Sequence, residues 1–128
     1  MTEDQLMKAL PAILALLVVS TTVPASAEHE QLSVGNLQEI CTRSDNRSKE
    51  ACRYYILGVT EGTRMAAAFV GGKTHFCIPE GVSLVAVESL IKNEIEEDLM
   101  VYPADRDLAA VGFVTAAAQK AYPCRGAN

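Results

Sequence analysis

The sequence predicts an all-α domain, a small disulfide-stapled bundle of about four helices, of which one is short and three are longer. Apolar residues recur every three or four positions in three long segments, which is the spacing of a helix with one buried face. Glycine and proline residues stand between those segments, where they would end each helix. No stretch of useful length alternates apolar and polar residues as a half-buried strand does.

The N-terminal residues 1–27 have the plan of a cleaved signal peptide. Lys8 precedes an apolar run of about a dozen residues, which is too short to span a bilayer, since spanning takes about 20. Ala25-Ser26-Ala27 then supplies a small-x-small cleavage site. The residues before Met7 suit a signal peptide poorly, so Met7 is an alternative start. Residues 28–128 would form the single exported domain.

Composition excludes some classes of partner. The chain of 128 residues has a net charge of −5, and it lacks the basic face that nucleic-acid binding usually requires. It also has no polybasic block or basic amphipathic helix that would bind a membrane surface. We therefore expect neither nucleic acid nor a membrane to be a partner of the mature domain.

Two helices are expected in the first half of the domain. Residues 33–41 form a short helix candidate in which Asn36 and Glu39 resemble a capping pair. A polar turn then leads into a long helix that Gly71-Gly72 would end after Val70. Its expected inward positions are Cys52, Tyr55, Ile56, Val59, Gly62, Thr63, Ala66, Ala67 and Val70.

A third helix is expected over about Leu84 to Met100, with Ser83 as its N-cap. Its apolar stripe consists of Leu84, Val87, Ile91, Ile95 and Leu99. The acidic side of this helix could imitate a glycosidase carboxylate pair, but acids on an amphipathic helix are more often solvated. We interpret these acids as a solvated face, including Glu94, Glu97 and Asp98.

A last helix should follow the break at Pro103. Asp105 or Asp107 can cap it, and Pro123 ends it just after Ala121. Its expected inward residues are Leu108, Val111, Val114, Thr115, Ala118 and Ala121.

The four cysteines indicate two disulfides, because an even count in a small exported domain usually does. The close C-x-x-C pairs of a zinc site are absent from the sequence, so we expect no metal and no cofactor. The helix from Cys52 to Val70 would be about 27 Å long, while the seven residues that follow reach at most about 25 Å. A bridge from Cys52 to Cys77 would need a taut connector along the whole helix.

An up-down bundle instead favours the pairs Cys41–Cys52 and Cys77–Cys124, because each pair then lies at one end of the bundle. The alternative pairing, Cys41–Cys124 with Cys52–Cys77, stays open if the long helix breaks near Gly62.

Gly58 and Gly62 lie one turn apart on the long helix, and each costs about 1 kcal/mol of helix propensity relative to alanine. The close approach of another helix would offset that cost. We favour helix packing within the chain, with Tyr55 beside the glycines, over a seam with a second copy, which stays open.

Three motifs in order resemble one known family. They are "CRYYILGVTEG", "FCIPEGVSL" and "YPADRDLAAVGFVTAAAQKAYPC". Together they resemble the Tai/Rap family of type VI secretion amidase immunity proteins over about residues 41–124. Glu61 stands where an aspartate is more usual in the family. The matching positions are Cys52, Tyr55, Gly58, Val59, Gly62, Cys77, Pro79, Gly81, Val82, Pro103, Ala109, Ala110, Tyr122, Pro123 and Cys124.

This resemblance implies an α-helical periplasmic protein, often a homodimer, that binds and blocks a peptidoglycan-cleaving amidase. An enzyme is not expected, since no hydrolase or phosphate-binding motif occurs and bridged cysteines are not nucleophiles. A rigid loop should make the contact, with Met100, Tyr102 and Asp105 as candidate partner-binding residues, although the same segment also reads as a plain interhelical connector. The alternative function is a periplasmic structural or stress-related chaperone-like protein with no toxin partner.

Overall fold

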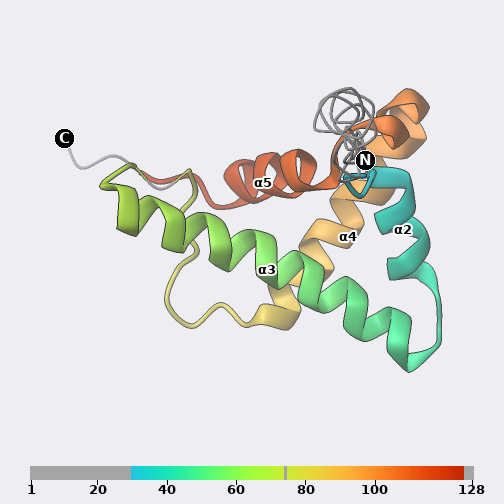
Figure 1. Ribbon diagram of the computed structural model, residues 1–128, viewed down its shortest axis with the longest axis horizontal. Coiled ribbons are helices and arrows are strands. Elements are labelled where there is room, and N and C mark those ends of the chain that lie inside the picture. The colour runs from blue at the N-terminus through green and yellow to red at the C-terminus, as the bar shows by residue number, and fades with distance from the viewer. Residues whose placement is uncertain (1–29, 74, 126–128) are drawn as a thin grey trace, which may run out of the picture.

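The structure, a computed structural model, describes residues 30–73 and 75–125 and consists of helices in this part of the chain (Figure 1). The elements are α2 (Val34–Thr42), α3 (Asn46–Val70), α4 (Leu84–Val101), the 3-10 helix η1 (Pro103–Asp107) and α5 (Ala110–Ala121). The described residues hold no strand, only an isolated bridge between Ser33 and Ala109. The all-α prediction is confirmed. The signal peptide, its cleavage site and the alternative start lie outside the described residues.

The long helix α3 extends along one side of the molecule, and the other helices pack against it (Figure 1). The short α2 lies at the N-terminal end of α3, while α5 lies beside the part of α3 nearer its C-terminus. The helix α4 crosses behind α3 and contacts α2, α5 and η1 as well. One core connects these helices, and its largest inaccessible side chains are Phe76, Leu37, Ile56, Ile91, Ile95, Val34 and Val114.

Local capping explains where most helices begin and end. The side chains of Asp45 and Ser83 accept hydrogen bonds from the first turns of α3 and α4, and Gly71 ends α3 at φ 66°, a left-handed conformation that glycine adopts without steric cost. The predicted capping pair of Asn36 and Glu39 is wrong, because Ser33 is the N-cap and its Oγ accepts from the Asn36 N–H at 3.2 Å.

The predicted start of the last helix is also wrong. Residues 103–107 wind into η1, and α5 begins after Ala109 without a side-chain cap. The Ala110 N–H donates to Leu32 O at 2.8 Å, so a backbone partner from another segment satisfies this helix start.

The apolar stripes are only partly buried. In α4 the stripe is confirmed from Val87 onward, whereas Leu84 is half-exposed. In α5 the buried residues are Ala110, Val114, Ala117 and Ala118, so the inward assignment of Leu108 and Val111 is wrong. In α3 the buried residues are Cys52, Ile56 and Thr60, all in its first 15 positions. The predicted inward positions Gly62, Ala66 and Val70 are exposed instead.

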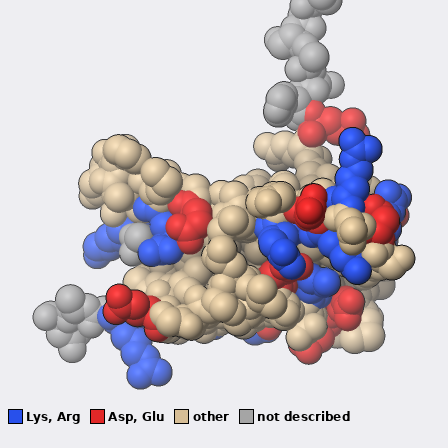
Figure 2. All heavy atoms as spheres, turned by 90° about the horizontal axis from the view of Figure 1, so that it is seen from below, with Lys and Arg blue, Asp and Glu red and all other residues tan. Residues whose placement is uncertain are grey.

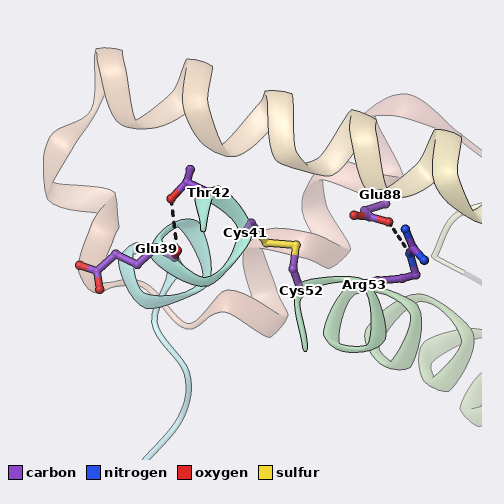
Figure 3. Close-up of a disulfide and its surroundings, with 6 residues drawn as sticks. All are labelled: Glu39, Cys41, Thr42, Cys52, Arg53 and Glu88. Atoms are coloured by element: carbon purple, nitrogen blue, oxygen red, sulfur yellow. Dashed lines mark hydrogen bonds and ion pairs between the residues drawn. A yellow bond between two sulfur atoms is a disulfide. The ribbon is translucent and has the colours of Figure 1, made fainter. Parts of the chain in front are cut away.

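Both disulfides form as the helix geometry predicts, between Cys41 and Cys52 and between Cys77 and Cys124. The first joins the end of α2 to the start of α3 (Figure 3). The neighbouring Arg53 Nε donates to Glu88 Oε2 at 2.9 Å, and this bond connects α3 to α4 beside the disulfide (Figure 3). The second disulfide ties the connector after α3 to the chain just past α5, where Cys77 N–H also donates to Tyr122 O.

Candidate functional site

The segment from Met100 to Leu108, which we call the α4–α5 turn, is built around Pro103. Its ring occupies the first position of η1, where no N–H is needed and where its fixed φ suits a helical turn. The Tyr102 N–H closes α4 by donating to Asp98 O at 2.7 Å, and the Asp105 N–H donates to Tyr102 O at 3.0 Å. These local bonds give the turn a defined backbone.

Contacts with the start of the domain hold the turn in place. The Val34 N–H donates to Leu108 O at 2.9 Å, which attaches the end of the turn to the first residue of α2. The Arg106 guanidinium donates to Gln38 Oε1 at 3.1 Å. Gly35 allows this approach, since a Cβ built there would lie 3.2 Å from Arg106 Nε. The turn is therefore clamped between α2 and α4.

Apolar side chains project from this clamped turn. Met100 is 76% exposed, Tyr102 is 60% exposed, and their neighbours Val101 and Leu108 are also exposed. Asp105 in the same turn is partly buried. Of the three predicted partner-binding residues, Met100 and Tyr102 are thus accessible to another molecule, whereas Asp105 is only partly accessible.

The carboxylate of Asp105 interacts with that of a second acidic residue, Asp98. The Asp98 carboxylate lies at the base of the turn, and its Oδ2 is inaccessible and has no hydrogen-bond partner in the part of the chain described. Burial raises the pKa of Asp98, and the nearby negative charge of Asp105 raises that pKa further. Glu94 acts in the same direction and Lys120 opposes it.

The interpretation of these acids as solvated is therefore wrong for two of them. Asp98 is partly buried. Glu94 and Lys120 both line a hollow of ≈ 180 Å³ between α4 and α5, and Glu94 Oε2 accepts a hydrogen bond from Lys120 Nζ at 2.7 Å. The sequence did carry a signal for Asp98, because it follows Ile95 by three residues and so continues the apolar stripe of α4.

A second exposed surface runs along α3. We call it the outer face of α3, and its residues follow one another at spacings of one, three or four: Ala51, Tyr54, Tyr55, Gly58, Gly62, Met65, Ala66 and Phe69. Tyr55 is partly buried and the others are exposed, Phe69 to 84%. A groove of ≈ 500 Å³ opens over the middle of this face, bounded on the far side by Val111 of α5.

The predicted packing of Gly58 and Gly62 within the chain is not found. A Cβ built on either glycine meets no atom of another described segment within 4 Å. The two glycines and Tyr55 all line the groove. Seen from the side on which α3 lies, the middle of the molecule carries few charged side chains, which gather toward the edges (Figure 2).

Comparison with known families identifies the fold's relatives. The model of the Rap1a immunity proteins matches residues 33–124, which takes in every described helix and all four cysteines. The chain belongs to the Rap1a immunity protein family. Neither the curated proteins nor the solved structures gave a significant match to it.

Membership of the Rap1a family directs attention to binding surfaces rather than to a catalytic centre. Within residues 30–73 and 75–125, no helix has the length and apolarity needed to cross a membrane. The same residues contain no group of three or more His, Cys, Asp and Glu side chains placed to hold a metal. What this Rap1a-family protein does offer is two exposed apolar surfaces, the α4–α5 turn and the outer face of α3.

Proposed function

We propose that this Rap1a-family protein acts in the periplasm, after removal of residues 1–27, as the immunity protein of a type VI secretion effector that cleaves peptidoglycan as an amidase. Family membership supports the immunity role. The proposed inhibitory element is the α4–α5 turn, which would cover the mouth of the enzyme's active-site cleft.

The observation that carries this choice is the contrast between the exposed side chains of the turn and its fixed backbone. Met100 and Tyr102 are exposed anchors of the kind that dominate interface energies. The clamp to α2 fixes the backbone that carries them, so little backbone conformational entropy is lost when they bind. Acids at the rim, Glu97 and Asp107, would steer the turn toward a basic surface.

The test is inhibition of an amidase effector encoded beside this gene, with purified peptidoglycan as substrate. We expect the oxidised mature protein to block cleavage at a stoichiometry of one chain per enzyme. Tyr102→Ala and Met100→Ala should each weaken binding by about 2 kcal/mol, which is about 30-fold in Kd. The matched control is Val85→Ala, since Val85 is an exposed apolar residue of similar exposure at the other end of α4.

Two outcomes would contradict the proposal. If Tyr102→Ala weakens binding to the amidase no more than Val85→Ala does, the turn is not part of the interface. Capture of many unrelated proteins from periplasm, in place of one stoichiometric hydrolase, would favour the chaperone-like alternative. The resemblance also implies a homodimer, but inhibition by the turn does not require one because both anchors lie on the same chain.

A further inference from the structure

Two carboxylates from consecutive elements lie together at the base of the α4–α5 turn. Asp98 belongs to the last turn of α4 and Asp105 belongs to η1, and these two elements pack against each other. Both residues are partly buried. The Oδ2 atom of Asp98 is inaccessible and accepts no hydrogen bond from the described residues. An ionised Asp98 is therefore an unsatisfied buried acceptor beside a second negative charge, which is an unfavourable arrangement.

The backbones of the same two residues hold Tyr102, a proposed anchor of the turn. The Tyr102 N–H donates to Asp98 O at 2.7 Å, and Tyr102 O accepts from the Asp105 N–H at 3.0 Å. The Leu108 N–H donates to Asp105 O at 3.1 Å, which connects Asp105 to the end of the turn as well. Repulsion between the two carboxylates therefore acts on the segment whose backbone bonds give the turn its shape.

The other charged groups nearby are bonded elsewhere. On α4, Glu94 adds a further negative charge close to the pair. On α5, Lys120 has the opposite and smaller effect, and its Nζ is bonded to Glu94 Oε2 at 2.7 Å. On η1, the Arg106 guanidinium is directed to α2, where it donates to Gln38 and lies 3.9 Å from Glu39. A proton is thus the group best able to relieve the repulsion.

One proton changes the interaction between the two acids. A protonated Asp98 carries an O–H that can donate to the Asp105 carboxylate, and one of the two negative charges is removed. Burial and the charge of Asp105 raise the pKa of Asp98 above its ordinary value. A docked turn therefore binds this proton more tightly than a released turn does. Docking is favoured at acid pH, and it weakens as the pH rises through the raised pKa.

We infer that Asp98 and Asp105 make the α4–α5 turn a proton-sensitive switch, which is held against the domain when Asp98 is protonated and loosens when both carboxyls are ionised. This inference concerns the regulation of the proposed inhibitory element, and so it rests on the proposed function. Met100 and Tyr102 project from the backbone that the pair controls. A loosened turn loses more backbone entropy on binding, so the protein should bind its effector more weakly as the pH rises.

The first experiment measures hydrogen exchange of the Tyr102 and Asp105 amides by NMR, without any effector. Protection factors, which are corrected for the intrinsic pH dependence of exchange, report the free energy of local opening. In the oxidised mature protein we expect both to fall at least about threefold between about pH 4.5 and about pH 7.5. Asp98→Asn, which stays neutral, should keep them constant. The Tyr122 N–H, which donates to Ala118 O at the end of α5, is the internal control.

Asp105→Asn is a second variant, because it removes the facing negative charge and keeps the size of the side chain. It should reduce the pH dependence, and adding it to Asp98→Asn should cause no further change, since the two positions act as a pair. Glu96→Gln, at an exposed position of the same helix, is the matched control and should keep the wild-type profile. The same profile in wild type and Asp98→Asn would overturn the inference. A flat profile in Glu96→Gln would do the same.

The second experiment measures binding to the amidase effector over the same pH range. The amidase has titrating groups of its own, so the quantity compared is the ratio of the wild-type Kd to that of Asp98→Asn, in which the effector's own protonation cancels. We expect this ratio to rise at least about threefold from about pH 4.5 to about pH 7.5. A constant ratio, with both proteins bound, would overturn the inference.

The two experiments separate this inference from the proposed function. If neither protein binds the amidase at any pH, the immunity proposal fails. Hydrogen exchange still decides whether the turn responds to the proton, since it is measured on the immunity protein alone.

Discussion

The two halves of α3 have similar sequence patterns but different surroundings. In the first half, Cys52, Ile56 and Thr60 are inaccessible beneath α2, α4 and α5. In the second half, Met65, Phe69 and Val70 are exposed although the helix continues without interruption. Apolar periodicity therefore predicts that a helix has an apolar face, but it does not predict whether other segments of the same chain bury that face.

Thr60 marks the boundary between these halves. Its hydroxyl donates to Ile56 O at 2.9 Å, so a polar side chain is buried without an unsatisfied donor. Beyond it, α3 keeps contact with the chain mainly through small or partly buried residues such as Thr63 and Ala67. The second half of α3 therefore contributes no fully buried side chain to the core.

The largest expected effect comes from the disulfide that restrains this sparsely packed end. Replacing Cys77 and Cys124 together by serine should lower the free energy of unfolding by about 4 kcal/mol, because the bridge closes a loop of 47 residues. The corresponding change at Cys41 and Cys52, with a separation of 11, should cost about 3 kcal/mol. Urea unfolding of both double variants measures the difference, and a larger loss at the first disulfide would contradict this assignment.

The next test compares one apolar residue from each half of α3. Ile56→Ala should cost about 3 kcal/mol of folding free energy, since the side chain is only 2% exposed and its removal leaves a cavity. Phe69→Ala should change the stability of the monomer by less than about 0.5 kcal/mol, because the ring is exposed. Chemical denaturation of diluted samples provides the measurement. A large loss at Phe69 in the monomer would show that the second half is packed within the chain after all.

The smallest effect should be a pH dependence at the well-packed end. Burial and the nearby Asp105 raise the pKa of Asp98, so the folded protein binds this proton more tightly than the unfolded chain does. Stability from this group is therefore present at acid pH and is lost as the pH rises through the folded pKa. Asp98→Asn removes that loss and should raise the melting temperature at neutral pH, with a gain that shrinks toward acid pH. Glu97→Gln, on the exposed side of α4, is the control and should show no such trend.

Much of the fold could be predicted from local signals. Ser83 begins α4 and Gly71 ends α3 as the capping rules expect, because these effects act within one turn of the chain. Helix length, connector reach and the expected up-down arrangement together favoured the observed disulfide pairing over its alternative. The choice of Met100 and Tyr102 as exposed side chains was also possible, since Pro103 had to interrupt the helix there.

Other features depend on neighbours that are distant in sequence. Asp98 and Glu94 look like surface acids until α5 and η1 pack against α4 and bring Lys120 and Asp105 beside them. The start of α5 has no local cap, and its first N–H is satisfied by Leu32, which precedes it by 78 positions.

The amino-acid sequence by itself determined the order of the long helices and the ends that local capping sets, and it favoured the observed disulfide pairing, because those depend on spacing, capping and chain length. Only the tertiary structure decided which helix faces are covered, since burial is a property of the whole arrangement and not of a window of residues. The glycines of α3 show the difference: their place one turn apart is plain in the sequence, while the groove that they line with Val111 of α5 exists only in the folded arrangement.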